Sequence, residues 1–354
     1  VRRQTHDRWQ MIIIDDGSTD DTAAVAAEAA AGDPARFVVL RQSNQGQARA
    51  RARGLEAAEG EYLVLLDADD RLEPEMMAAL LGRLERDPDA AAAVGDAWLV
   101  DEYETRRWLF TQTRTRPWPA VLDYNPHGAL AGAMFRRATI TALGGLTFPG
   151  ASGCEDWDIW VRLARCGRRV VACEGPPVAR YRQSAGSFSR RATAMLRSGV
   201  DLLETCRRED ARLAGAPWPA ASAIDDESYQ RLRNLRVFHA LGVALAAGGG
   251  AMPDGALAQT LEPILTELAG GTFDRAAAVE QLRWGVQFVA WADPEAKAWT
   301  PERARAAVKL ICGALEHAGV RSDTRRLAHE LESALVAPDR PAPLLRRILR
   351  RLRG

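Results

Sequence analysis

The stretch Met11-Ile12-Ile13-Ile14-Asp15-Asp16-Gly17-Ser18-Thr19-Asp20 decides the fold class of this 354-residue chain. Its apolar first part predicts a strand, and the polar turn after it predicts a helix that is capped by Ser18 or Thr19. Further apolar runs alternate with alanine-rich stretches, at residues 37–40, 62–66, 91–94 and 170–172. This alternation is typical of an α/β domain with a mostly parallel sheet flanked by helices.

The second half of the chain has a different composition. From about residue 192 the β-branched runs disappear, and alanine, leucine and arginine dominate between scattered prolines and glycines. A chain of 354 residues is long enough for about two domains of ~150 residues each. We therefore predict an α/β domain in residues 1–191 and an all-helical domain in residues 192–354.

Composition excludes several classes of protein. The 47 basic and 47 acidic residues cancel, which argues against a nucleic-acid partner bound by bulk charge. Since no run reaches the ~18 apolar residues of a membrane-spanning helix, we expect a cytoplasmic location. Five cysteines without a Cys-x-x-Cys pair indicate neither a disulfide framework nor a structural zinc site.

Acidic side chains follow two of the predicted strands directly. Asp15 and Asp16 end the first strand, and Asp67 and Asp69 follow the strand at residues 62–66. In an open parallel sheet, ligands bind at the carboxyl ends of the strands, where these side chains would meet. Asp67 and Asp69 are two residues apart and can address a ribose hydroxyl and a divalent metal together. The alternative is that each aspartate only forms a turn or caps a helix.

A third acidic group stands at the predicted start of a helix. Glu155 and Asp156 precede Trp157 in a segment with helical spacing of apolar residues. Acids in a first helical turn also pair favourably with the helix dipole, which is the structural alternative. Because this pair follows a metal-type carboxylate pair, it is better interpreted as a general base that is delivered from across a cleft.

In their order, these motifs resemble glycosyltransferase family 2. The resemblance runs from about Gln4 to about residue 190 and rests on Ile12 to Asp20, Asn44-Gln45-Gly46, Ala50-Arg51, Glu59 to Tyr62, Leu66 to Asp70 and Glu155-Asp156. It implies the GT-A fold and inverting transfer of a sugar from a nucleotide sugar, usually UDP-linked, with a bound Mg or Mn ion. The implied acceptor is a glycan or a lipid-linked sugar in cell-envelope or polysaccharide synthesis.

Position by position, the resemblance implies a role for each residue. Asp156 would be the general base, and Asp69 the metal ligand. Glu155, Trp157 and Arg182 would lie near the diphosphate or the acceptor. The remaining residues would bind the nucleotide sugar: Asp15, Asp16, Asn44, Gly46 and Asp67. For Arg51, which lies on a predicted amphipathic helix, a role in the site and a solvated or salt-bridged position both remain open.

Members of this family begin with a strand and a helix before the position of Gln4. We expect the chain as given to lack this first strand and helix. A sheet without a central strand leaves two strand edges unpaired, with a loss of backbone hydrogen bonds.

Two other functions stay open from the sequence. One is a sugar-phosphate nucleotidyltransferase, although no glycine-rich basic loop for a triphosphate is present. The other is a non-catalytic scaffold or binding module built on a degenerate transferase domain. Residues 344–354 form a basic amphipathic segment, which either packs on the helical domain or contacts an anionic membrane surface. No pattern in the sequence indicates an oligomeric state.

Overall fold

The computed structural model of the chain describes residues 1–104, 107–112, 116–128, 130–150, 153–184, 186–248, 254–268, 274–292, 300–319 and 324–336. They divide into two compact units. Unit 1 comprises Val1–Gln183 and Arg208–Ala223, and unit 2 comprises Ser184–Arg207 and the described residues from Ile224 onward. The predicted boundary at residue 191 falls shortly after the first change of unit. The basic segment 344–354 lies outside the described residues.

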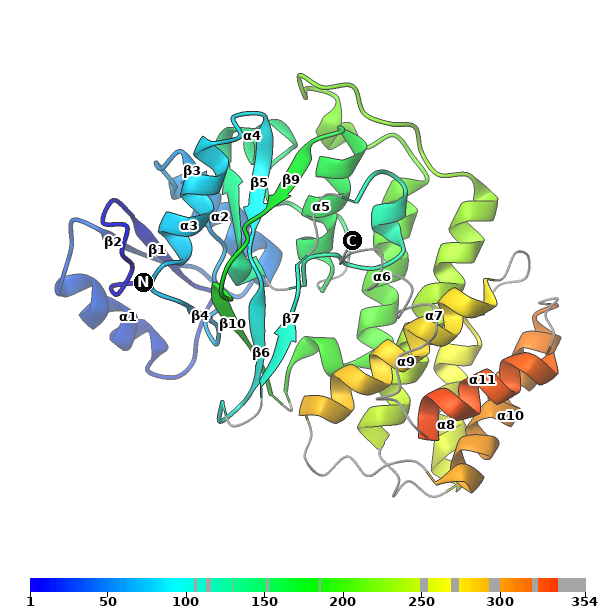
Figure 1. Cartoon of the computed structure of the whole chain (residues 1–354). Coiled ribbons are helices and arrows are strands. Elements are labelled where there is room, and N and C mark those ends of the chain that lie inside the picture. Colours follow the sequence, from blue (N-terminus) through cyan, green and yellow to red (C-terminus); the bar gives the residue numbers. More distant parts are fainter. Residues whose placement is uncertain are drawn as a thin grey trace. The chain divides into compact units, whose positions relative to one another are not determined.

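Unit 1 combines strands and helices (Figure 1). Its strands are β1 (Met11–Asp15), β2 (Phe37–Arg41), β3 (Tyr62–Leu63), β4 (Arg71–Leu72), β5 (Ala90–Val94), β6 (Ala97–Asp101), β7 (Arg107–Phe110), β8 (Ala133–Arg136), β9 (Arg169–Ala172) and β10 (Ala179–Gln183). Its α-helices are α1 (Thr22–Ala31), α2 (Gln47–Ala57), α3 (Met76–Glu85), α4 (Arg137–Ala142) and α5 (Glu155–Arg165). The α/β class with flanking helices is confirmed.

The sheets of unit 1 are mixed rather than mostly parallel. One sheet has the order β3-β8-β5-β9, a second has the order β4-β10-β6-β7, and β1 pairs with β2. β1 is parallel to β2, β5 to β9 and β6 to β10. However, β8 runs antiparallel to both of its neighbours, and β6 and β7 form an antiparallel pair. The sequence pattern missed β8 and all four strands of the second sheet, because these short strands carry no distinctive run of β-branched residues.

Two predicted elements are shorter than the sequence pattern indicated. The strand predicted at residues 62–66 pairs with β8 only at Tyr62 and Leu63. The helix predicted to start at Ser18 or Thr19 begins at Thr22, after Asp21. Its start is delayed because the Asp15 carboxylate accepts a hydrogen bond from the backbone N–H of Ser18 at 2.9 Å and holds a turn there. Among the strands that the structure describes, β1 and β2 pair only with each other.

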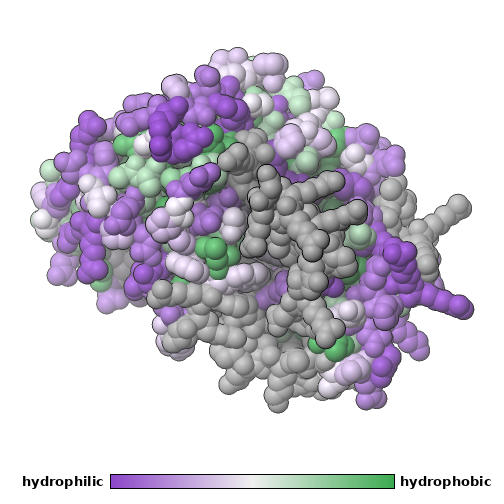
Figure 2. Space-filling model, viewed as in Figure 1, coloured by the Kyte–Doolittle hydropathy of each residue, from purple (hydrophilic) through white to green (hydrophobic). Residues whose placement is uncertain are grey.

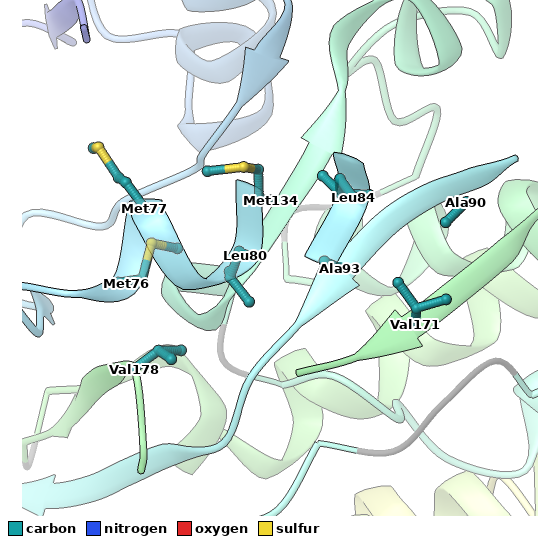
Figure 3. Packing of buried hydrophobic residues seen from close by; sticks show 9 residues of the cluster. All are labelled: Met76, Met77, Leu80, Leu84, Ala90, Ala93, Met134, Val171 and Val178. Atoms are coloured by element: carbon teal, nitrogen blue, oxygen red, sulfur yellow. The ribbon is translucent and has the colours of Figure 1, made fainter. Parts of the chain in front are cut away.

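The core of unit 1 lies between α3 and the sheet that contains β5. Figure 3 shows side chains of α3 pointing toward Ala93 on β5, Met134 on β8 and Val171 on β9. Leu80 and Leu84 on α3 are fully buried there. This packing fixes α3, which begins shortly after the Asp67–Asp70 turn, and thereby positions that turn over the sheet edge.

The regular elements that the structure describes in unit 2 are helices. Its α-helices are α6 (Ala192–Cys206), α7 (Asp226–Gly248), α8 (Asp254–Leu265), α9 (Arg275–Ala292), α10 (Pro301–His317) and α11 (Thr324–Val336). Helices α7 and α9 cross closely, and a Cβ atom on Gly242 would lie only 2.1 Å from the carbonyl oxygen of Leu282. Glycine at this crossing allows the two backbones to approach.

The surface and the helices give two further facts. In Figure 2 the described part of the visible face is mostly hydrophilic, with small separate hydrophobic areas. None of the helices that the structure describes has the length and apolar content needed to cross a membrane.

A buried ion network fastens helix α5 in unit 1. Asp158, which is 1% exposed, accepts hydrogen bonds from Arg162 Nε at 2.9 Å and from both terminal nitrogens of Arg212 at 2.8 Å. Arg162 also donates to the carbonyl oxygens of Leu143 and Gly145. Since Arg212 belongs to the segment Arg208–Ala223, this network ties the returning chain and the loop after α4 to the helix that begins at Glu155.

We expect Asp158→Asn to destabilise unit 1 by about 3–5 kcal/mol, because the substitution leaves the buried guanidinium of Arg162 without its carboxylate. Urea unfolding of the purified chain measures this loss. Glu61→Gln is the matched control, since Glu61 is 73% exposed and pairs with Arg136 at 3.5 Å. Its loss should stay below about 1 kcal/mol. Equal losses for both variants would contradict a dominant role of the buried network.

Candidate active site

The turn after β3 carries the first carboxylate of the candidate site. The Asp67 Oδ1 atom accepts hydrogen bonds from Arg51 Nη2 at 2.6 Å and from Gln47 Nε2 at 3.1 Å. Both donors lie on α2, which begins directly after Gly46 and packs against β1. The fold therefore brings the two predicted acidic regions of the sheet edge together through α2.

Arg51 also reaches the first residue of α5. Its Nη1 atom lies 3.3 Å from Glu155 Oε1, and its side chain is only 12% exposed. Although burial favours the neutral form, the carboxylates of Asp67 and Glu155 raise the pKa of Arg51. One guanidinium thus joins two acids that are far apart in the sequence, and it does so as a permanent cation.

Asp156 is partly buried beside this bridge. Its Oδ2 atom accepts a hydrogen bond of 2.9 Å from the side-chain amide of Asn125. Burial raises the pKa of Asp156 to about 7, and the negative charge of Glu155 acts in the same direction. Arg51 and the bond from Asn125 oppose this rise. A carboxylate that titrates near neutrality is suited to accept a proton from a substrate hydroxyl.

Asp16 organises the loop between β2 and α2. Its carboxylate accepts hydrogen bonds from Gln42 Nε2 at 2.8 Å and from the backbone N–H groups of Gln45 and Gly46 at 2.9 and 2.8 Å. Burial raises the pKa of Asp16, but these three bonds outweigh that effect and lower it. The predicted site residue Asn44 is exposed in the same loop. Most of the acceptor capacity of Asp16 is therefore used within the protein.

Gly17 lets this loop approach β1. Its φ angle is +81°, and a Cβ atom on it would lie 2.7 Å from the backbone nitrogen of Asn44. The neighbouring Asp15 is 3% exposed and forms an ion pair with Arg41 at 3.1 Å. The side-chain and backbone hydrogen bonds with Ser18 lower the pKa of Asp15, which fixes its negative charge in the turn.

Asp69, Asp70 and Arg182 meet at the end of the Asp67–Asp70 turn. Asp70 is buried, and it accepts a hydrogen bond of 2.9 Å from the backbone N–H of Arg182. Burial raises the pKa of Asp70 to about 8. The Arg182 guanidinium donates to the carbonyl oxygens of Asp69 and Glu102 and to the Glu104 carboxylate. The structure thus places Arg182 next to the turn but engages its side chain with the loop after β6.

Trp157 is placed in the core rather than beside the carboxylates. It is 5% exposed, and its indole Nε1 donates a hydrogen bond of 2.9 Å to the carbonyl oxygen of Val121. This bond secures the short 3-10 helix Ala120–Leu122, which precedes Asn125. Trp157 therefore shapes the site through packing, and its predicted place near the diphosphate or the acceptor is not supported by this burial.

The carboxylate oxygens of the Asp67–Asp70 turn fit a divalent cation that takes most of its ligands from a substrate. No group of three or more His, Cys, Asp and Glu side chains gathers around a metal position in the part of the chain that the structure describes. Magnesium commonly uses one or two protein carboxylates and completes its shell with phosphate oxygens and water. Asp69 suits such a site because its side chain is exposed, with no hydrogen bond or ion pair from the described residues.

No local sequence pattern points to Asn125, and the pattern around Arg51 leaves the role of this residue open. Asn125 lies in an irregular segment between two 3-10 helices, far in sequence from Asp156, so no local pattern links the two. For Arg51 the available signal was its place one turn into the helix that follows the Asn44–Gly46 loop. The structure shows that this helix directs the Arg51 side chain to Asp67 and to Glu155.

Comparison with known proteins supports the resemblance. Residues 1–143 match the sequence profile of "Glycosyl transferase family 2". The chain is 30% identical over 213 residues to the putative glycosyltransferase EpsH of Bacillus subtilis. This alignment covers 58% of this chain and 61% of EpsH. The chain is 39% identical over 77 residues to the putative teichuronic acid biosynthesis glycosyltransferase TuaG of the same organism, covering 22% of this chain and 31% of TuaG. The chain thus spans less than two thirds of these relatives.

A solved structure shares the fold over most of the chain. S. aureus TarS 1-349, crystallised in complex with UDP, aligns with a TM-score of 0.50 over 94% of this chain and 84% of TarS 1-349. The sequence identity is only 13%. This likeness confirms the GT-A-like fold with a helical C-terminal region.

Asp156→Asn should remove the loss of folding stability that ionisation of Asp156 causes as the pH rises. The folded-state pKa of Asp156, about 7, exceeds its usual value of 3.8, so the folded chain holds this proton longer than the unfolded chain. Its contribution to stability is therefore lost as the pH rises from about 4 to 7. We expect the Asn variant to gain stability relative to wild type over this range and to show a constant difference above about pH 8. Urea unfolding at several pH values measures the trend.

Asp16→Asn serves as the control of opposite sign. Hydrogen bonds lower the pKa of Asp16, so its stabilising contribution is present above its unfolded pKa and is lost as the pH falls through its folded pKa. The deficit of this variant should shrink in acid. If the stability difference at Asp156 were independent of pH, its raised pKa would be refuted.

Proposed function

We propose that the chain, whose residues 1–143 belong to glycosyl transferase family 2, transfers a sugar from a nucleotide-sugar donor to an acceptor hydroxyl with inversion at the anomeric carbon. The observation that carries this proposal is the convergence of Asp67 and the Glu155-Asp156 pair on Arg51. It unites a sheet-edge turn suited to the donor with a carboxylate that titrates near pH 7.

The donor end of the site would be formed by the turns after β1 and β3. The loop that Asp16 organises would receive the nucleotide base, with Asp15, Asn44 and Gly46 shaping its wall. The Oδ2 atom of Asp67 would accept a hydrogen bond from a ribose hydroxyl, because Gln47 and Arg51 both donate to Oδ1. UDP in the TarS 1-349 structure, which shares this fold, favours a UDP-linked donor.

Asp156 would act as the general base. In one displacement, the acceptor oxygen forms a bond to the anomeric carbon while the bond from that carbon to the diphosphate oxygen breaks. The hydroxyl proton moves to Asp156, and the nucleoside diphosphate leaves with the electron pair. The hydrogen bond from the Asn125 amide would hold the Asp156 carboxylate in place for this proton transfer. No covalent intermediate with the enzyme is needed.

Asp69 would hold the divalent cation, Mg or Mn. When bound, such a cation would supply positive charge to the diphosphate leaving group. The exposed Asp69 carboxylate lies two residues after Asp67 in the same turn, on the donor side of the site.

The acceptor would be a glycan or a lipid-linked sugar. The relative TuaG is a putative teichuronic acid biosynthesis glycosyltransferase, which favours a role in cell-envelope or other polysaccharide synthesis. A cytoplasmic location, with peripheral membrane contact through residues 344–354, would suit such an acceptor and remains part of this proposal.

Asp156→Asn should reduce turnover by about two to four orders of magnitude, because the amide keeps the shape of the side chain but accepts no proton. Hydrolysis of a panel of nucleotide sugars with Mn²⁺ measures the rate without a known acceptor. Glu61→Gln, at an exposed ion pair, should retain the wild-type rate. Near-normal hydrolysis by the Asn variant would exclude Asp156 as the base, whereas no hydrolysis by wild type would favour a non-catalytic module.

Asp69→Ala should abolish metal-dependent UDP binding while leaving the melting temperature unchanged, since an exposed loop carboxylate contributes little to the core. Titration calorimetry with and without Mn²⁺ measures the affinity. Asp89→Ala is the control, because Asp89 is also exposed but lies between α3 and β5. Equal UDP affinity of the Asp69→Ala variant and wild type in Mn²⁺ would refute the assignment.

A further inference from the structure

Arg51 lies between the Asp67 turn and the start of α5. Its two terminal nitrogens contact two carboxylates, Asp67 at 2.6 Å and Glu155 at 3.3 Å, from separate elements. Glu155 is itself buried, and its second oxygen accepts a 2.6 Å hydrogen bond from the backbone N–H of Gly153. The bridge therefore reaches the start of α5 through a carboxylate whose own position is fixed.

We infer that Arg51 is a positioning residue, whose bidentate bridge between Asp67 and Glu155 holds the base Asp156 in register with the donor turn. This inference rests on the proposed function. It assigns to one side chain the task of joining the donor side of the site to the base side, and nothing in the family match itself requires it.

The geometry explains why arginine serves here. A guanidinium presents several donors in a rigid planar fork, so one side chain can satisfy two carboxylates at once. A lysine ammonium carries the same charge as a single flexible point and cannot hold both acids in fixed geometry. Without any cation, Asp67 and Glu155 would face each other through a poorly solvated region and repel.

Arg51 also acts on the charge of the base. Two charged groups face Asp156: Glu155 on α5 itself and Arg51 from α2, while Asn125 contributes a neutral hydrogen bond. Glu155 raises the pKa of Asp156, and Arg51 lowers it. Loss of the Arg51 charge should therefore move the ionisation of Asp156 to higher pH, whereas loss of the fork alone should not.

Two substitutions separate geometry from charge. In the pH profile of nucleotide-sugar hydrolysis, the acid limb is the pH range in which the rate rises as Asp156 ionises, and the plateau is the rate above it. Arg51→Lys should leave the acid limb near that of wild type. It should lower the plateau rate by about tenfold or more, as expected for a misplaced catalytic group. Arg51→Gln should lower the plateau and also move the acid limb to higher pH. Arg49→Gln, which removes an exposed charge from the same helix, should change neither property.

Some outcomes would overturn the inference. A wild-type plateau rate in Arg51→Lys would show that the bridge is not needed for positioning. An Arg51→Gln rate that is lower by the same factor at every pH would indicate a purely structural ion pair. If the Arg51 variants do not fold, Glu155→Gln gives a second route, because removing this negative neighbour should move the acid limb to lower pH. An unchanged limb would also contradict the inference.

A direct titration separates this inference from the proposed function. Carbon-13 NMR of the side-chain carboxyl groups, with the Asp156 signal assigned by its loss in Asp156→Asn, reports the ionisation of Asp156 without catalysis. If wild type hydrolyses no nucleotide sugar, the proposed function fails, yet the Asp156 signal should still titrate at higher pH in Arg51→Gln than in wild type. An unmoved signal would overturn the inference in either case.

Discussion

The repulsion between carboxylates that the fold gathers at one place is the constraint on which the site depends. Asp67, Glu155 and Asp156 come from a turn and a helix start, and their charges would drive these elements apart unless a cation lay between them. Arg51, nearly buried and permanently charged, supplies that cation from a third element. Burial, together with the negative charge of Glu155, raises the pKa of Asp156 to about 7, and the charge of Arg51 only partly opposes this rise.

The surrounding structure is built to keep these elements in place. Asp16 fastens the loop before α2, so that this helix starts at a fixed point and presents Arg51 one turn later. Asp158 fastens α5 from its other face through Arg162 and Arg212. Asp16 and Asp158 thus act as anchors for the two helices whose ends meet at the site.

The same organisation explains why the fold is shared at low sequence identity. TarS 1-349 has the same fold at 13% identity, which shows that the architecture tolerates extensive sequence change. The helical unit is held by its own packing, including the close crossing of α7 and α9 at Gly242. Its residues carry no part of the candidate site described above, so the chemistry proposed for this chain rests on unit 1.

Sequence alone determined the α/β class, the helical second half and the acidic positions at the strand ends, because apolar periodicity and turn residues are local signals. It identified Asp156 as a candidate base and left Arg51 undecided. Only the tertiary structure decided that the sheets are mixed, that Trp157 lies in the core, and that Asn125 and Arg51 contact the acidic groups. The physical reason is that strand pairing, burial and the approach of charges depend on contacts between residues far apart in the chain, and no local pattern of residue types encodes which distant partner a side chain will meet.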